Sequence, residues 1–230
     1  MQAHRQILSV REMTRGIVQR IRNPLNALLL NLDNLDDDIA EPNESKKNIP
    51  ERLKRIRNAV AELDSLLSEV LRLTDLPKPQ ITASNVNALV TEVETFSRPE
   101  SSRKEIAVKL DLQQGLPAIQ ADPVQLKQAF LSVLFNAIEA CPVKGSIVLA
   151  TEAKRNQLII RIMDNGKGIP PARQGRIFEP FFSTKEAGAG LGLPLALEIV
   201  KLHRGEISFS SQAGGGSTFV ISLPISADES

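Results

Sequence analysis

The sequence predicts two regions of different fold class: an all-α helical hairpin that forms a dimeric four-helix bundle, followed by an α+β sandwich of sheet and helices. Residues 1–80 contain one glycine and no aromatic residue, whereas ten of the 13 glycines lie within residues 166–216. Apolar residues recur every three or four positions in the first region, while the second region combines that period with strict alternation.

The first predicted element is a helix over residues 7–39, because its apolar positions form a heptad seam. With Thr14 admitted to the pattern, the seam comprises Ile7, Val10, Ile17, Ile21, Leu25, Leu28, Leu32, Leu35 and Ile39. Two successive steps of four residues beside Pro24 predict a local stutter, and a proline inside a helix kinks it.

A partner helix is predicted over residues 53–70, where apolar residues keep an unbroken spacing of three and four. The polar stretch 36–50, with Pro42 and Pro50, is typical of a turn between helices. A two-helix hairpin leaves its narrow apolar seam half uncovered, so pairing with a second copy is the economical way to bury it. The alternative is a monomeric hairpin that packs on the rest of its own chain.

Residues 74–79 predict a short stiff linker, because Pro77 and Pro79 restrict the backbone. The periodicity after it predicts helices at 84–96, 123–140 and 192–203, and strands at 106–112, 146–151, 158–163, 207–209 and 219–223. We therefore divide the chain into a hairpin (1–76), a linker (77–80), a sandwich domain (81–226) and a tail (227–230).

Composition excludes several classes of protein. At 230 residues each region can bury a core of its own, and Cys141, the single cysteine, cannot form an internal disulfide. The 28 Lys and Arg balance 27 Asp and Glu, which gives no field that favours nucleic acid or anionic lipid. No apolar run approaches the roughly 18 residues that span a bilayer, and no signal peptide is visible. We therefore expect a cytoplasmic protein.

Four clusters in the second region carry candidate chemistry: Asn136 in a helix, 164–168 after an apolar strand, the aromatic run 177–182, and the glycine-rich run 188–193 that opens a helix. Singly, each has a structural explanation, as a satisfied core amide, a common turn or a tight connection. Glycines beside Asp164 allow a ligand to approach the backbone, and a helix start exposes free N–H groups. The P-loop and dinucleotide-binding patterns do not fit these glycines.

In this order and spacing, the clusters resemble the nucleotide-binding domain of bacterial sensor histidine kinases and of their relatives, the anti-sigma kinases, gyrase and chaperone ATPases, over about residues 80–225. The resemblance implies ATP and Mg²⁺ as cofactors, with Asn136 as a metal ligand and Asp164 accepting from the adenine amino group. It makes residues 183–190 a lid over the phosphates, and the short lid resembles the nitrogen-regulatory subtype.

The nucleotide-binding residues implied by the resemblance are Asn136, Asp164, Gly166, Gly168, Lys185, Gly188, Gly190, Leu191, Gly192 and Leu193. Lys185 is placed to reach a phosphate as a point charge. One position departs from the family, whose helix commonly carries a second asparagine one turn before the first, where this chain has Ser132. We expect that departure to weaken ATP binding rather than to abolish it.

The hairpin also resembles this family, because residues 21–25, Ile-Arg-Asn-Pro-Leu, match the segment after its phosphoacceptor histidine. The resemblance puts Gln19 at the acceptor position and Arg20 at the position of the acidic residue that deprotonates it. An amide nitrogen has no available lone pair, and a guanidinium stays protonated, so neither replaces its counterpart. Asn23 is the amide that family phosphatases use to orient a water, but we expect that activity to be weak here.

Neither histidine of the chain replaces the missing acceptor. His4 lies about 22 Å from position 19 along a helix, at 1.5 Å per residue. His203 ends a helix of the nucleotide domain, where the family also often has a histidine, and we predict a structural role for it.

The resemblance leaves three hypotheses open. The first is a two-component signalling protein, dimeric through the hairpin, that binds Mg-ATP but has lost histidine autophosphorylation. The second is a kinase that phosphorylates a non-histidine residue, in itself or in a partner. The third is a scaffold that docks a response regulator and ignores nucleotide. In each, the chain is expected to be the cytoplasmic part of a longer receptor or a cytoplasmic protein.

Overall fold

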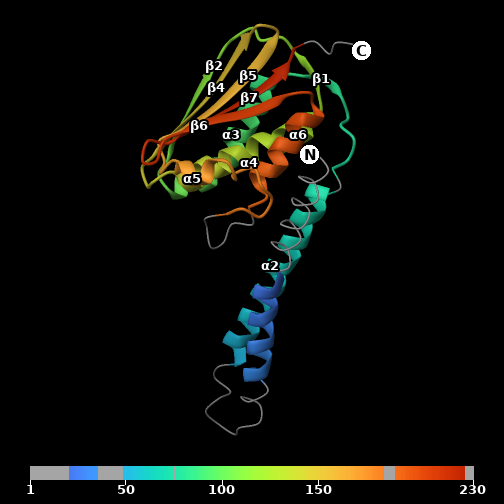
Figure 1. The fold of residues 1–230 in the computed structure, drawn as a ribbon, viewed down its shortest axis with the longest axis vertical. Coiled ribbons are helices and arrows are strands. Elements are labelled where there is room, and N and C mark those ends of the chain that lie inside the picture. The colour runs from blue at the N-terminus through green and yellow to red at the C-terminus, as the bar shows by residue number, and fades with distance from the viewer. Residues whose placement is uncertain (1–20, 36–48, 75, 184–189, 226–230) are drawn as a thin grey trace. The chain divides into compact units, whose positions relative to one another are not determined.

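The computed structural model describes residues 21–35, 49–74, 76–183 and 190–225 (Figure 1). The described residues form two compact units. One contains residues up to 74 together with 180–183 and 190–191, and the other contains 76–179 and 192–225. No helix of these described ranges combines the length and apolarity needed to cross a membrane.

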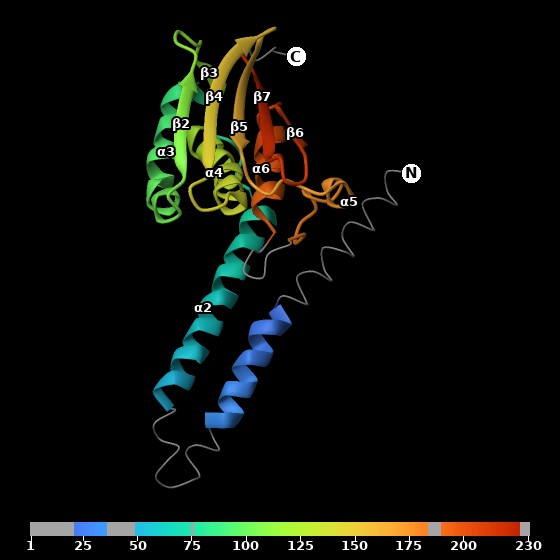
Figure 2. The same ribbon diagram turned by 90° about the vertical axis from the view of Figure 1, so that its left-hand side faces the viewer.

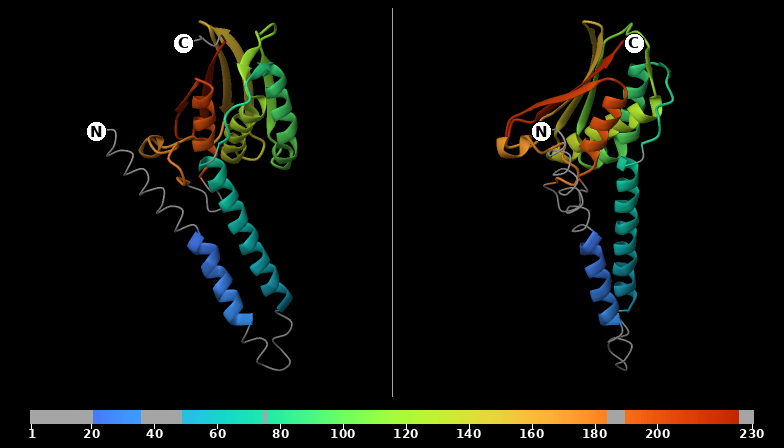
Figure 3. Two further views of the ribbon diagram at one scale, coloured as in Figure 1. Left: turned by 90° about the vertical axis from the view of Figure 1, so that its right-hand side faces the viewer. Right: turned by 45° about the vertical axis from the view of Figure 1, so that its right-hand side comes forward.

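The first unit contains two helical stretches of the predicted hairpin, whose residues 1–20 lie outside the described part of the chain. Residues 21–35 are helical and run alongside α2 (Ile49–Thr74), as the two views of Figure 3 show. The predicted second helix is confirmed, but it begins earlier than the pattern indicated, with Pro50 inside its first turn. Proline fits there because the first backbone N–H groups of a helix have no partner within it. Of the predicted turn, residues 36–48 lie outside the described part of the chain.

Large apolar side chains on both hairpin helices remain exposed to solvent in the single chain. They are Leu25 (42% exposed), Leu29 (58%), Leu30 (62%), Leu32 (44%), Leu53 (41%) and Val60 (51%). Leu25, Leu32, Leu53 and Val60 belong to the predicted seams. A group of large apolar side chains exposed on a helix pair indicates a surface that another protein covers.

The second unit is a five-stranded sheet with helices packed on it (Figure 2). The strand order is β2 (Ala107–Leu112), β4 (Ser146–Lys154), β5 (Gln157–Asp164), β7 (Ser217–Pro224) and β6 (Glu206–Ser211). Only the β2–β4 pair of this sheet is parallel. A two-residue turn joins β4 to β5, and both of its residues, Arg155 and Asn156, have positive φ, as a type I′ turn requires.

Three helices pack against the sheet or against one another: α3 (Val86–Arg103), α4 (Pro123–Ala140) and α6 (Gly192–Leu202). The core side of the sheet is apolar because burial alternates along β5 and β7, where every second residue is buried. The α4 bounds agree with the prediction, since Asp122 caps the helix and Pro123 follows it.

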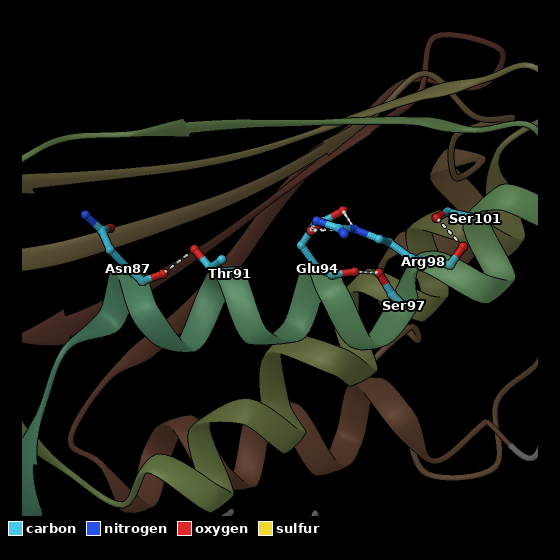
Figure 4. Close-up of polar contacts among 6 residues, drawn as sticks. All are labelled: Asn87, Thr91, Glu94, Ser97, Arg98 and Ser101. Carbon is cyan, nitrogen blue, oxygen red and sulfur yellow. Dashed lines mark hydrogen bonds and ion pairs between the residues drawn. The ribbon is translucent and has the colours of Figure 1, made fainter.

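The prediction was wrong at α3, which continues to Arg103 and not to residue 96. Pro99 lies inside the helix, and the buried face of its last turns is polar, with Glu94, Ser97 and Ser101 (Figure 4). The two serine hydroxyls donate to backbone oxygens three residues earlier, and Glu94 accepts two hydrogen bonds from Arg98 Nε and one from Nη2. These local bonds satisfy the buried polar groups, so the helix persists where its apolar period ends.

Three short elements were absent from the prediction: β1 (Thr82–Ser84), β3 (Ile119–Ala121) and α5 (Pro171–Gln174). β1 and β3 pair with each other in a separate antiparallel ladder. Elements this short contain too few residues to show a period.

Candidate functional site

Asp164 is the last residue of β5, and its carboxylate is turned into the core side of the sheet. Every second residue of β5 is buried, so Asp164 follows Leu158, Ile160 and Ile162 on the inward face, with 9% of its surface exposed. Its Oδ1 accepts a hydrogen bond from the backbone N–H of Gly166 at 2.8 Å. This buried carboxylate at a strand end is the candidate hydrogen-bond acceptor of the nucleotide site.

The pKa of Asp164 lies above its ordinary value. Burial is the largest cause, because it disfavours the charged form, and backbone N–H groups of Gly166 and Ser217 partly offset it. Gly166 belongs to the loop after β5, whereas Ser217 begins β7 and lies opposite Asp164 in the ladder. The carboxylate is therefore held from two sides by segments that are distant in sequence.

The C-terminal end of α4 contacts the loop that follows Asp164. The N–H of Lys167 donates to the carbonyl of Ala140 at 3.2 Å, and a Cβ on Gly166 would lie 2.6 Å from the same oxygen. Asn136, one turn earlier on α4, is half-buried. The glycine thus lets α4 and the loop approach each other, and α4 brings Asn136 to the neighbourhood of this loop.

The start of α6 contacts the same helix. A Cβ on Gly192 would lie 3.7 Å from the Cβ of Ser132, which is one turn before Asn136 on α4. Gly192 is exposed and opens an 11-residue helix, whose first N–H groups lack partners within the helix. Free N–H groups at the positive end of a helix dipole favour an anion such as a phosphate. Leu193, the next residue, is half-buried.

At Gly168 and Gly216, another backbone segment of the same chain occupies the space that a side chain would need. A Cβ on Gly168 (φ +62°) would lie 1.8 Å from the carbonyl oxygen of Gln212, and one on Gly216 (φ +80°) would lie 2.0 Å from that of Asp164. We expected Gly168 to leave room for a ligand beside the backbone. The structure fills that space with the turn between β6 and β7, because only glycine lets two backbones approach so closely.

Gly168→Ala is expected to destabilise the chain by about 3 kcal/mol, the sum of a left-handed backbone penalty of about 1 and a steric term of about 2 kcal/mol. Gly115→Ala is the matched control, since Gly115 also has a positive φ (+72°) but nothing within 4 Å of the added Cβ. Urea unfolding of both variants measures the difference. Equal losses in the two variants would contradict the steric argument.

Several candidate residues fall outside the described part of the chain: Gln19, Arg20, Lys185 and Gly188. Asn23 is exposed in the helical stretch 21–35. Gly190 has φ +69°, and its carbonyl accepts from the N–H of Phe181 at 3.0 Å, while Leu191 is 3% exposed.

The aromatic run contributes to the core of the second unit through Phe178. Its ring lies edge-on to Phe209 of β6, with centroids 6.0 Å apart, and Phe209 stacks on Phe219 of β7 at 5.8 Å. The ring contacts that fix Phe178 are therefore made with the sheet, and the run is not a cluster formed only within itself.

Hydrogen bonds of His203 and Asp122 connect the end of α6, the start of α4 and the segment at Gln80. The backbone N–H of Asp122 donates to His203 Nε2 at 3.0 Å, and His203 Nδ1 lies 2.8 Å from the carbonyl of Ile199. The ring is thus a neutral tautomer that donates from Nδ1 and accepts at Nε2. These bonds support the predicted structural role of His203.

The Asp122 carboxylate accepts from Val124, Gln125 and, 42 residues away, Gln80. Burial raises its pKa, but the three backbone N–H donors outweigh burial, so the net pKa is lowered. The Asp-Pro pair at 122–123 is a helix-start signal, so the capping role was visible in the sequence, whereas the partner Gln80 was not.

The donor set near Asn136 fits Mg²⁺ only with help from a ligand. Among the described residues no group of three or more His, Cys, Asp or Glu side chains is arranged to hold a metal ion. Magnesium prefers oxygen ligands and is often held by one or two protein groups together with substrate phosphates and water. The amide oxygen of Asn136 suits that arrangement.

Three features characterise this domain: a sheet with a buried carboxylate at the end of β5, a helix α4 that contacts the loop after that carboxylate, and a helix α6 whose first residue lies against α4. Sequence comparison names the class of this domain. Residues 121–227 match the family described as histidine kinase-, DNA gyrase B-, and HSP90-like ATPase, and residues 9–79 match the His Kinase A (phospho-acceptor) domain.

Curated relatives match nearly the whole of this chain and are longer than it. Sporulation kinase C of Bacillus subtilis (strain 168) is 32% identical over 218 residues, which cover 94% of this chain and 49% of that protein. Sensor histidine kinase ZraS of Escherichia coli (strain K12) is 30% identical over 225 residues, or 98% of this chain and 48% of that one. The chain thus spans about half the length of these relatives.

Solved structures of histidine kinases have a similar fold. Histidine kinase ThkA in complex with response regulator protein TrrA matches with a TM-score of 0.76 and 25% identity, over 98% of this chain and 65% of that chain. Full-length ShkA in complex with AMPPNP matches with a TM-score of 0.69 at 22% identity, over 98% of this chain and 46% of that chain, which shows a shared fold. The chain belongs to the sensor histidine kinase family and contains both domains of its catalytic core.

Proposed function

We propose that this chain is the core of a two-component signalling protein that binds Mg-ATP and has lost histidine autophosphorylation. The observation that carries the nucleotide part is Asp164, a buried carboxylate at the end of β5, beside a loop in contact with α4. The loss of autophosphorylation rests on Gln19 and Arg20, which stand where the family has its acceptor and its base.

Each group of the site has a role in this proposal. Asp164 accepts a hydrogen bond from the adenine amino group, because an ionised carboxylate has only acceptor atoms. Asn136 supplies an oxygen to Mg²⁺, and the N–H groups at the start of α6 face the phosphates. By the resemblance, residues 183–190, which include Lys185, Gly188 and Gly190, would be the lid over the phosphates.

The absence of phosphoryl transfer to residue 19 follows from chemistry. The attacking atom needs an available lone pair, which neutral imidazole has and an amide nitrogen lacks, since amide resonance delocalises it. Arg20 cannot remove a proton near neutral pH because its guanidinium stays protonated. The signal would then pass by conformation or through a partner. A response regulator is the partner class we propose, as ThkA forms a complex with one.

Incubation with labelled ATP, followed by acid and alkali treatment, separates this proposal from its rivals. No label is expected on the chain. Acid-labile label on a histidine would overturn the proposal, and acid-stable label would favour a kinase acting on serine or threonine. ATP with Mg²⁺ at about 100 times its dissociation constant should stabilise the chain by about 2.7 kcal/mol. No stabilisation would favour a nucleotide-independent scaffold.

We further propose that the hairpin forms a homodimer. The support is the apolar surface of residues 21–35 and α2, where Leu29 and Leu32 are 58% and 44% exposed in the single chain. Leu32→Glu is expected to shift the chain from dimer to monomer, because a charge in an apolar interface is costly. Sedimentation velocity measures the shift. Lys54→Glu, a change at an exposed polar position of α2, is the control. A monomeric parent chain would exclude the dimer.

A further inference from the structure

Three adjacent strands end in polar residues on the same face of the sheet. Asp164 of β5 lies opposite Ser217 of β7, and Ser217 lies opposite Ser211 of β6. Period-two alternation places all three on the inward side, two positions along their strands from Ile162, Phe219 and Phe209 respectively. A polar row therefore crosses the sheet at the end where the candidate acceptor lies, and Ser211 is its outermost member.

The hydroxyl of Ser211 joins two separate segments. Its Oγ accepts from the N–H of Ile169 at 2.8 Å, and it donates to the carbonyl of Gly216 at 2.9 Å. Ser217 Oγ also lies 2.9 Å from it. A hydroxyl has one proton and two lone pairs, so these three contacts use its full capacity when Ser217 donates to it. Ile169 ends the loop after Asp164, and Gly216 ends the turn before Ser217.

Other bonds fasten the same two segments. Gln174 Nε2, from α5, lies 2.9 Å from the carbonyl of Ile169 and 3.0 Å from that of Ser211. The N–H of Gly214 donates to the carbonyl of Lys167 at 2.8 Å. Several hydrogen bonds thus connect the loop 165–169 with the turn 212–216. Among them, the Ser211 hydroxyl bonds directly to both segments.

The two fastened segments are the ones that hold the carboxylate. Gly166, in the loop, donates its N–H to Asp164 Oδ1, and Ser217, directly after the turn, supplies the second N–H. We propose that Ser211 is a positioning residue for Asp164: its hydroxyl holds the loop and the turn in register, so that both N–H groups stay directed at the carboxylate. The inference rests on the proposed nucleotide site only for its effect on ATP affinity.

As a consequence of this positioning, we expect the Asp164 carboxylate to be preorganised as a hydrogen-bond acceptor. A carboxylate fixed by two N–H groups stays directed at its ligand and loses little freedom on binding. If the Ser211 hydroxyl is removed, the two segments separate more readily and the N–H groups stabilise the ionised carboxylate less well. The pKa of Asp164, already raised by burial, should then rise further.

The test compares Ser211→Ala with Ser211→Thr, which keeps the hydroxyl, and with Ser208→Ala, a control at an exposed position of the same strand. In the full chain without nucleotide, NMR titration of the Asp164 side-chain carboxyl carbon should show a higher pKa in Ser211→Ala than in the parent. ATP affinity measured by calorimetry at neutral pH should fall about tenfold, the loss typical of one hydrogen bond at the upper end of its range. Ser211→Thr should restore both values, and Ser208→Ala should change neither.

The two readouts keep the inference separate from the proposed function. An unchanged Asp164 titration in Ser211→Ala would overturn the positioning role, even if the variant were less stable. So would a threonine variant that behaves like the alanine variant. If the parent chain binds no ATP, the proposed function fails, and the titration without nucleotide still decides whether Ser211 positions Asp164.

Discussion

Asp164→Asn is expected to remove most of the stabilisation that ATP and Mg²⁺ give to the chain. The substitution keeps the shape of the side chain but replaces one carboxylate oxygen with an amide NH₂ group, which donates hydrogen bonds and cannot accept one from the adenine amino group. A hydrogen bond to a charged group contributes about 1.5–3 kcal/mol, so we expect ATP affinity to fall by a factor of about 10 to 100. Thermal unfolding with and without nucleotide measures the loss.

Asp111→Asn is the matched control, since Asp111 is an exposed carboxylate on β2 and the charge change is identical. The nucleotide-free Asp164→Asn chain should be at least as stable as the parent at neutral pH. The reason is that a raised pKa means the ionised Asp164 costs folding free energy above that pKa, and a neutral amide avoids the cost. An undiminished nucleotide shift in Asp164→Asn would show that the adenine assignment is wrong.

Gln19→His combined with Arg20→Glu is expected to produce an acid-labile phosphorylated chain where the parent gives none. The first change supplies a nitrogen with an available lone pair, and the second supplies a carboxylate that can take up its proton. The motif that follows, residues 21–25, already resembles the family. Label from ATP, followed by acid and alkali treatment, detects the product.

Two further variants separate the contributions of the two residues and of the nucleotide site. Gln19→His alone, with Arg20 retained, should label more slowly because the base is missing. The double variant with Asp164→Asn added should label only at high ATP concentration, since the site then binds nucleotide weakly. If the double variant binds ATP but takes up no label, the loss of activity has a cause beyond residues 19 and 20.

Long elements could be predicted because their signals are local. The bounds of α4 follow from its period together with the Asp122 cap and Pro123, which lie within a few residues of each other. The turn between β4 and β5 likewise follows from the alternation on either side of it. The end of α3 could not be predicted, because Glu94, Ser97 and Ser101 are satisfied within the helix, and no apolar period marks that part of it.

The pairing of short strands could not be predicted from hydrophobic periodicity either. β1 and β3 contain three residues each, and they meet only because residues near Thr82 and Ala121 are brought together by the rest of the fold. Stability of such a pair comes from its tertiary surroundings, which a local sequence window does not contain.

The sequence by itself determined the family and the helix start at Gly192. It also pointed to Asp164 as a candidate hydrogen-bond acceptor and to Gln19 at the phosphoacceptor position that the resemblance implies, because these inferences depend on residue type and order. Only the tertiary structure decided what holds Asp164 in place. Ser211 bonds to a residue 42 positions away, and His203 bonds to one 81 positions away. Strand register and helix packing determine such partners. Gly168, where we expected room for a ligand, and Gly216 are instead the places where two backbone segments of the same chain meet.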